Sequence, residues 1–245
     1  MKIIPLSEGS FTVDGTKKFI PFNPSADKLS DRTRGSLLVE IQPFLVITKN
    51  DVILLDAGLG MKDASGQFQI FQNLKQAGIA PSDVTKVLMS HLHKDHVGGL
   101  INPFTGNLSF ENALHYVQQQ EMDYALEKSS PSYDREILDV LRYADRYTPL
   151  QTDDGLIDGY IEYQVSGGHA KYHQVFWIRE QGETVFFAGD EASQAFQIKA
   201  RFSAKYDYDG KKAMQLREKW WEEGKKEGWT FLFYHDVKSP IIHAH

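Results

Sequence analysis

Residues 90–100 of the chain, SHLHKDHVGGL, place three of its nine histidines and one aspartate within six positions. Side chains two residues apart lie on the same side of an extended segment but not of a helix. His91 and His93 therefore converge only if the chain here is extended or looped. The apolar run at 84–90 is typical of a strand, and it would deliver the chain to the cluster in that form.

Asp95 and His96 are adjacent, so their side chains must diverge, and one cation is not expected to accept all four groups. Two cations side by side fit better, one on His91 and His93 and the other on Asp95 and His96. Gly98 and Gly99 permit the tight backbone path that such crowding requires. Imidazoles this close repel one another when protonated, whereas a bound cation keeps them neutral. The cluster therefore indicates metal binding; the alternative is a histidine-rich surface loop.

More side chains of the kind that bind metals follow other apolar runs. They are Asp56 near the end of 51–58, His169 and His173 after 160–165, Asp190 at the end of 184–190, and His235 and Asp236 at the end of 229–236. Ends of neighbouring strands meet along one edge of a sheet, where sites are commonly built. Each residue alone is equally typical of a turn or of a structural histidine; together they predict one site.

The apolar pattern alternates between strands and helices. Strands are predicted at 36–49 and 51–58, joined by a turn at Asn50-Asp51, and at 84–90, 160–165, 174–180, 184–190 and 229–236, with a hairpin turn at Gly182. Helices are predicted at 69–78, 132–147 and 209–228. Hairpins followed by helices, twice over, indicate a layered α/β domain.

Composition limits the other functions. The chain has 245 residues and no cysteine, so thiolate ligands, disulfides and a cysteine nucleophile are excluded. A formal net charge of −6 does not favour nucleic-acid binding. No apolar run is long enough to span a membrane, and the N-terminus does not resemble a signal peptide, so we expect a cytoplasmic protein that does not bind membranes. The sequence is compatible with a homodimer and does not decide whether one forms.

The segments LLDAGLG (54–60), HLHKDH (91–96), SGGHAKYH (166–173), AGDEAS (188–193) and YHD (234–236) resemble, in order, the five motifs of the metallo-β-lactamase superfamily. The resemblance covers about residues 36 to 236. It implies an α/β (α+β) fold, a four-layer αββα sandwich. It also implies a single domain over residues 1–245, with a helical insertion at about 116–150, and a two-metal site on the edge of the sandwich.

Carried over residue by residue, the resemblance places one metal on His91, His93 and His169 and the other on Asp95, His96 and His235, with Asp190 bridging both. It gives Asp56, Asp95 and Asp190 catalytic roles, Asp56 by orienting ligands. His173 matches a structural position, and Asp236 is expected to orient His235. Outside the motifs, we expect His115 to be a surface strand residue, and His243 and His245 to lie in a mobile tail.

The implied enzyme is a dinuclear hydrolase that cleaves a small-molecule ester, lactone or related bond with a bridging hydroxide. Zinc suits imidazole-rich sites, and manganese, iron or cobalt are compatible with the carboxylates. The pattern is closest to the lactonase and esterase branch, although Ser193 stands where many of its lactonases carry tyrosine. Tyr124, Tyr133, Tyr143 and Tyr147 either roof the pocket or pack the insertion. The alternatives are a mononuclear iron enzyme resembling persulfide dioxygenase and a thioester hydrolase resembling glyoxalase II.

Overall fold

The computed structural model describes residues 1–128 and 130–244, which form two large mixed sheets and a small third one. The first sheet has the order β1-β5-β6-β7-β8-β9, and β6 to β9 run parallel. Its strands are β1 (Lys2–Pro5), β5 (Phe44–Ile47), β6 (Val52–Leu55), β7 (Lys86–Leu88), β8 (Leu114–Gln118) and β9 (Tyr147–Leu150).

The second large sheet has its strands in chain order, and only the pair β13–β14 is parallel. These strands are β10 (Asp154–Ile157), β11 (Ile161–Val165), β12 (Gln174–Glu180), β13 (Glu183–Phe187), β14 (Thr230–Leu232) and β15 (Ile241–His243). Gln181 and Gly182, both with positive φ, make the tight turn between β12 and β13. This turn and the β5–β6 hairpin are confirmed.

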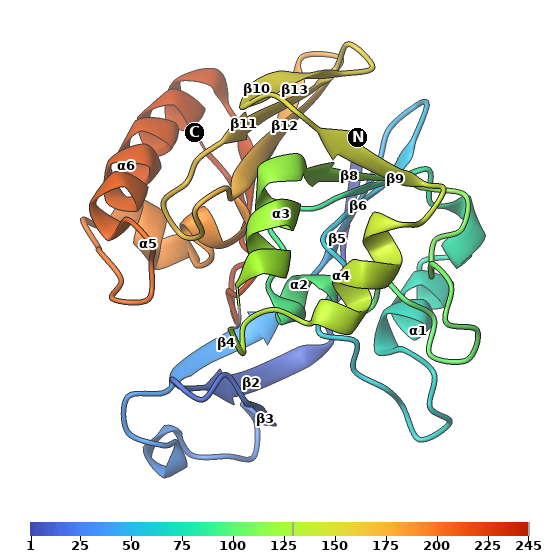
Figure 1. Cartoon of the computed structure of the whole chain (residues 1–245). Helices are drawn as coiled ribbons and strands as arrows, with labels where there is room; N and C mark the ends of the chain where they lie inside the picture. Colours follow the sequence, from blue (N-terminus) through green and yellow to red (C-terminus); the bar gives the residue numbers. More distant parts are fainter. Residues whose placement is uncertain (129, 245) are drawn as a thin grey trace.

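The third sheet is formed by β2 (Gly9–Val13), β3 (Phe19–Pro21) and β4 (Leu37–Ile41), in the order β3-β2-β4. It projects from the body of the molecule, at the bottom of Figure 1. The single strand predicted at 36–49 is wrong, because it divides into β4 and β5 in different sheets. The break falls at Gln42-Pro43, where proline has no N–H to continue a ladder.

Six α-helices occur in the described part of the chain: α1 (Gln69–Gln76), α2 (Lys94–Val97), α3 (Gln119–Glu127), α4 (Arg135–Arg142), α5 (Ala195–Lys199) and α6 (Gly210–Glu227). Those predicted at 69–78, 132–147 and 209–228 are α1, α4 and α6. Two of the helices, α3 and α4, fill the segment between β8 and β9, where the helical insertion is expected. No helix of the described residues has both the length and the apolar character that crossing a membrane requires.

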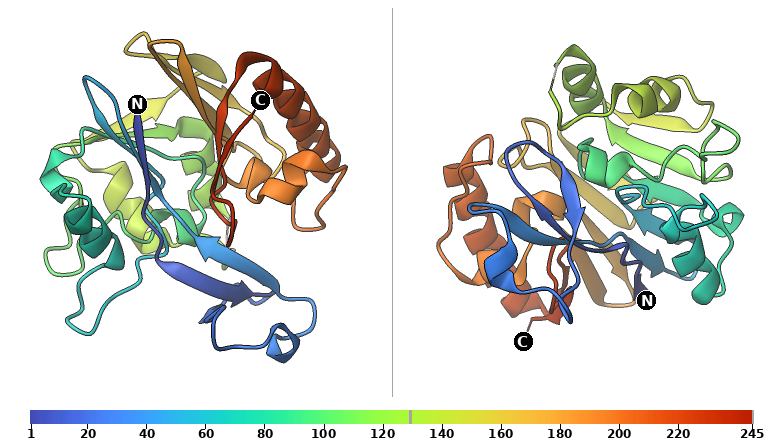
Figure 2. Two further views of the ribbon diagram at one scale, coloured as in Figure 1. Left: turned by 180° about the vertical axis from the view of Figure 1, so that it is seen from behind. Right: turned by 90° about the horizontal axis from the view of Figure 1, so that it is seen from below.

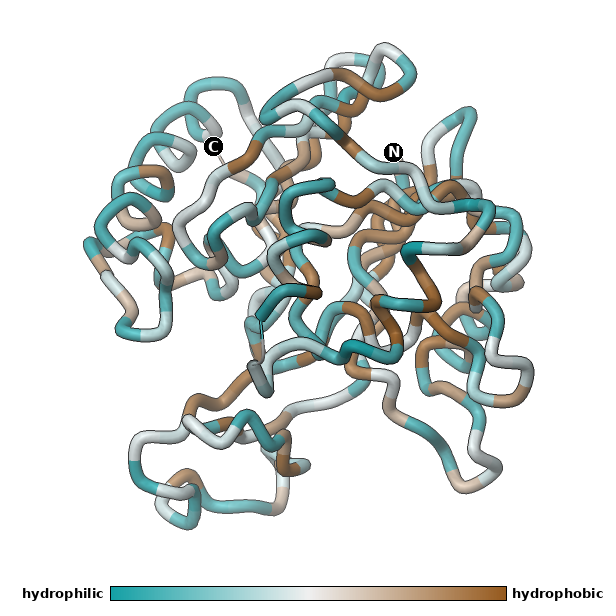
Figure 3. The backbone as a smooth tube through the Cα atoms, in the orientation of Figure 1, coloured by the Kyte–Doolittle hydropathy of each residue, from teal (hydrophilic) through white to brown (hydrophobic). Residues whose placement is uncertain are grey.

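The layers follow from three buried apolar clusters. One lies between the large sheets and contains Phe44 and Leu88 of the first sheet and Phe176 and Phe187 of the second. Another joins the outer face of the first sheet to α1, α3 and α4, and a third joins the second sheet to α5 and α6. Figures 1 and 2 show these helix groups on opposite outer sides, and Figure 3 shows the apolar residues concentrated on the inner strands. The predicted αββα sandwich is confirmed.

Two expectations about histidines outside the motifs are wrong. His115 is buried in β8, where its imidazole donates to the Ala113 carbonyl at 3.0 Å. His243 ends strand β15, which pairs with β14. His245 lies outside the described residues.

Candidate metal centre

The seven predicted metal ligands lie together where strands of both large sheets end. His91, His93, Asp95 and His96 follow β7 of the first sheet. The other three, His169, Asp190 and His235, follow β11, β13 and β14 of the second sheet. The cluster turns from extended chain at His91 and His93 into the short helix α2 at Lys94. Both halves of the sandwich therefore contribute to one centre.

One triad consists of His91, His93 and His169, whose nitrogens all lie within 4.8 Å of one another. His93 Nδ1 is 2.9 Å from His91 Nε2 and 3.3 Å from His169 Nε2. Two nitrogens bound to one tetrahedral zinc at about 2.0 Å would lie roughly 3.3 Å apart. The spacing of this triad therefore fits one ion.

A second triad consists of Asp95, His96 and His235, also within 4.8 Å. The Asp190 carboxylate lies between the triads. Its Oδ2 is 3.4 Å from His169 Nε2, and its Oδ1 is 3.0 Å from His235 Nε2. Despite these short distances, the buried atoms His96 Nε2 and Asp190 Oδ1 make no hydrogen bond of acceptable geometry among the described residues. Such atoms, aimed into one centre, fit a bound cation.

The charges of the centre agree with cation binding. Burial, together with the neighbouring imidazoles, lowers the pKa of His91 and His93 well below the usual range, so both offer neutral lone pairs. Although burial opposes its ionisation, Asp190 has a pKa well below the usual range because His235, His96 and His169 surround it. Although burial opposes their protonation, Asp190 raises the pKa of the other three imidazoles, those of His96, His169 and His235. Without a cation the centre thus combines two neutral imidazoles with an ionised carboxylate that holds protons on its neighbours, and a bound cation would replace those protons.

In four of the five imidazoles, the nitrogen that faces away from the centre has a hydrogen-bond partner. Ser90 Oγ lies 3.0 Å from His91 Nδ1, and Asp56 Oδ2 lies 2.7 Å from His96 Nδ1. Asp56 also accepts from the Ser90 N–H and hydroxyl. The last two partners are Asp207 Oδ1, 3.1 Å from His169 Nδ1, and the Glu40 carbonyl, 2.7 Å from His235 Nδ1. Such contacts fix ring orientation and tautomer.

Two more residues of the motifs have other contacts. His173 is buried beside the centre; its Nε2 accepts from the Asp190 N–H at 3.1 Å and its Nδ1 lies 3.0 Å from Ser166 Oγ, which agrees with the expected structural position. Asp236 accepts from the Ala195, Lys238 and Ser239 N–H groups. The expectation that Asp236 orients His235 is therefore wrong, because the Glu40 carbonyl occupies that position.

Glycines allow the loops of the centre to approach closely. The Gly98 and Gly99 N–H groups donate to the Gly58 and Ala57 carbonyls. A Cβ on Gly98 would lie 2.1 Å from the Leu59 carbonyl oxygen. These glycines are required for contact between loops, and neither has a positive φ.

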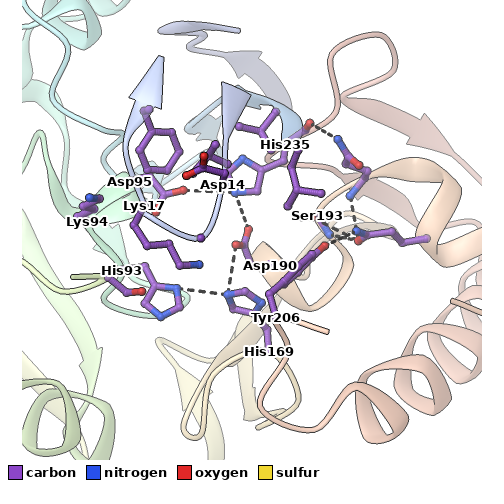
Figure 4. Close-up of a pocket in the computed structure, with 18 of the residues that line it drawn as sticks. Asp14, Lys17, His93, Lys94, Asp95, His169, Asp190, Ser193, Tyr206 and His235 are labelled. Carbon is purple, nitrogen blue, oxygen red and sulfur yellow. Dashed lines mark hydrogen bonds and ion pairs between the residues drawn. The ribbon is translucent and has the colours of Figure 1, made fainter. Parts of the chain in front are cut away.

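A cavity of about 240 Å³ opens beside the centre (Figure 4). His93, Asp95, His169, Asp190 and His235 form its polar floor. The β2–β3 turn contributes Asp14 and Lys17, and Figure 4 shows Lys17 extending toward His169. Its apolar lining consists of Val13, Phe19, Leu37, Val39, Phe196 and Phe202. None of the four tyrosines considered as a roof lines it.

Sequence reasoning missed several residues of the site. Asp207 and Tyr206 lie in the loop before α6, and Tyr206 lines the cavity, as does Gln197 of α5. Burial, with smaller contributions from Asp190 and Asp207, raises the pKa of Tyr206 to about 12. The segment YDYDG (206–210) contains two aspartates, and only the fold shows that Asp207 contacts His169 whereas Asp209 caps α6.

Comparisons with known proteins agree with this geometry. A sequence model of the metallo-beta-lactamase superfamily matches residues 40–235. An N-acyl homoserine lactonase of Bacillus thuringiensis is 29% identical over 84% of this chain and 86% of its own length. The lactonase AttM of Azorhizobium caulinodans is 36% identical, but the match spans only 43% of this chain and 40% of AttM.

Solved structures share the fold. A probable metal-dependent hydrolase from Staphylococcus aureus superimposes with a TM-score of 0.80 at 24% identity, covering 99% of this chain and 91% of that one. AidC, a dizinc quorum-quenching lactonase in complex with a product, has a TM-score of 0.74 at 19% identity, with coverages of 98% and 88%.

Proposed function

The chain belongs to the metallo-β-lactamase superfamily and is a metal-dependent hydrolase, and from this premise we propose that it cleaves a lactone or ester bond of a small molecule with two divalent ions. The observation that carries the proposal is the position of Asp190, whose two carboxylate oxygens face different triads of ligand atoms. One ion would be held by His91, His93 and His169. The other would be held by Asp95, His96 and His235.

Zinc is the proposed metal, because five of the seven side chains are imidazoles. When bound, such a pair of ions supplies an activated water and an electrophile for the substrate oxygen. The chain's own residues fix where that chemistry occurs. Asp190 sets the spacing of the triads, and Asp56 and Asp207 hold the rings of His96 and His169 in place.

The proposed substrate class has two supports. The relatives that match most of the chain are named N-acyl homoserine lactonases. Beside the polar floor, the cavity presents a wall of six apolar side chains, which suits a substrate that carries an acyl or aryl group.

Metal analysis and a substrate panel test the proposal. We expect two metal ions per chain, and hydrolysis of N-hexanoyl-homoserine lactone or 4-nitrophenyl acetate in preference to a phosphotriester or a glutathione thioester. One iron per chain with oxygen consumption on a persulfide would refute the dinuclear hydrolase. Preferred turnover of the thioester would refute the substrate class alone.

The Asp190→Asn variant tests the bridge. The asparagine amide has a single, neutral oxygen and cannot bridge two ions, so we expect metal content to fall and kcat to drop about 100-fold. His173→Ala is a neighbouring comparison, because His173 contacts the Asp190 backbone and none of the candidate triads includes it. It should keep its metal and lose stability. Unchanged turnover in Asp190→Asn would remove the bridging role.

A further inference from the structure

The side-chain amide of Gln197 has a fixed orientation. Its Oε1 accepts from the Ser193 N–H at 3.0 Å, the Ser193 hydroxyl at 3.3 Å and the Gln194 N–H at 3.3 Å. The residue is 2% exposed, so water does not compete for these contacts. With its oxygen engaged by three donors, the amide must present its NH₂ group on the other side.

On that side lies Tyr206. Gln197 Nε2 donates to the Tyr206 hydroxyl oxygen at 3.2 Å. The phenol therefore accepts this hydrogen bond, and its own hydrogen is left to donate elsewhere. No acceptor for that hydrogen is recorded within residues 1–128 and 130–244. The Tyr206 ring lies 6.0 Å from the His169 ring and lines the cavity beside Asp190 (Figure 4).

Ser193 is the other hydroxyl near the bridging carboxylate, but it has a different role. Its hydroxyl donates to Gln197, and the residue is 5% exposed. Ser193 therefore helps to orient the amide and has no hydrogen to offer a substrate. Of these two hydroxyl groups, only the phenol of Tyr206 has a hydrogen left to donate into the cavity.

We infer that Tyr206 is a catalytic residue that donates a hydrogen bond to the oxygen of the scissile carbonyl. Gln197 is a positioning residue that sets the direction of this donation. The inference rests on the proposed function. Negative charge develops on the carbonyl oxygen when a nucleophile attacks, and a preorganised donor stabilises it. No proton is transferred, because the phenol remains a neutral donor.

Tyr206→Phe in the metal-loaded enzyme tests the donor. With N-hexanoyl-homoserine lactone and 4-nitrophenyl acetate, we expect kcat to fall about 100-fold, the loss typical of one such donor, with KM changed less than about threefold. Tyr208→Phe is the matched control, because this exposed tyrosine lies two residues away and does not line the cavity. A Tyr206→Phe enzyme with wild-type kcat overturns the inference.

Gln197→Glu tests the direction of the hydrogen bond. The carboxylate keeps the shape of the amide and still accepts from Ser193 and Gln194. Its second oxygen, however, accepts from the Tyr206 hydroxyl and withdraws that hydrogen from the substrate. We expect kcat to fall as in Tyr206→Phe, and the double variant to lose no more than about a further threefold. If the losses in kcat multiply in the double variant, or if the Gln197→Glu enzyme keeps its activity, Gln197 does not act by orienting the Tyr206 hydroxyl.

A binding measurement decides the inference independently of turnover. With tyrosine labelled with ¹³C at Cζ, N-hexanoyl-homoserine should shift the Tyr206 signal in the metal-loaded wild type and not in Gln197→Glu. Equal shifts in both, or none in the wild type, overturn the inference. A wild type that hydrolyses no substrate of the panel refutes the proposed function instead, and the Tyr206 signal then still shows whether this hydroxyl contacts a bound ligand.

Discussion

At the scale of single residues, the candidate centre depends on buried side chains that hold other side chains. Asp56 and Asp207 are carboxylates with no place in either triad, and each contacts the outward nitrogen of one imidazole. Glu191 has a comparable role toward the backbone, because its buried carboxylate accepts from the Gly168 and His169 N–H groups. The position of His169 therefore follows from two acidic residues that are distant from it in sequence.

Glu121 of α3 is buried next to this region. Its Oε1 accepts from the Leu92 N–H at 3.4 Å and the Tyr133 hydroxyl at 3.3 Å, while its Oε2 has no partner among the described residues. Burial raises its pKa to about 7. Between about pH 4.5 and 7 the unfolded chain has released this proton and the folded chain retains it. The contribution of Glu121 to stability therefore decreases as pH rises through that window.

We predict that Glu121→Gln flattens this pH dependence. The amide resembles the protonated carboxyl, so the variant should exceed wild type in free energy of unfolding at pH 8 by about 1–3 kcal/mol, with little difference at pH 4.5. Urea unfolding at several pH values measures this. Glu111→Gln, at an exposed position, is the control. If the free energy of unfolding of the variant changes with pH as steeply as that of wild type, Glu121 ionises normally in the folded chain.

At the scale of elements, the centre requires close contact between the loop after β6 and the end of α2. Gly98 and Gly99 donate to carbonyls of residues 57 and 58, and neither has room for a Cβ. The same loop holds Asp56, which contacts His96 within α2. Packing of two backbones thus links the first motif to the second.

The variant Gly98→Ala should lower the free energy of unfolding by about 3 kcal/mol, since the new methyl group meets a backbone carbonyl that cannot rotate away. Gly15→Ala provides the comparison, because a Cβ at Gly15 meets no atom within 4 Å. Chemical unfolding of both proteins at one pH measures the difference. Equal stabilities would mean that the loops separate at little cost.

At the scale of the whole molecule, the centre joins the two halves of the sandwich. Four of its residues follow β7 in the first sheet, and three follow strands of the second sheet. Ions held by both halves would stabilise the folded chain, because the unfolded chain does not bring these side chains together.

Removing the metal should therefore destabilise the fold as well as abolish hydrolysis. With free zinc a thousandfold above its Kd, we expect each bound ion to raise the free energy of unfolding by about 4 kcal/mol over that of the chelated protein. Urea titrations with zinc and with EDTA measure this, and returning zinc should restore the difference. In the Asp190→Asn variant, the increase in the free energy of unfolding on adding zinc should be smaller. A wild type that unfolds identically in both conditions would argue against ions that connect the halves.

Much of this architecture was predictable from local sequence. Strands β11 to β13 and the hairpins at Asn50-Asp51 and Gly182 follow from apolar runs and turn residues. The division of residues 36–49 into two strands is not predictable in this way, because both parts are apolar and only Pro43 marks the break. His115 was misplaced because the pattern of alternation does not reveal that helices cover the outer face of β8.

The motifs of the chain are enough to identify the family and the side chains that gather at the centre, because HLHKDH and the strand-end residues combine spacing with side-chain chemistry. The surroundings of these side chains are visible only in the folded molecule. Asp207 beside His169, the Glu40 carbonyl beside His235, and Gln197 beside Tyr206 are contacts between separate loops. Such contacts depend on how the layers pack and which backbones approach, and no local pattern in the chain records them.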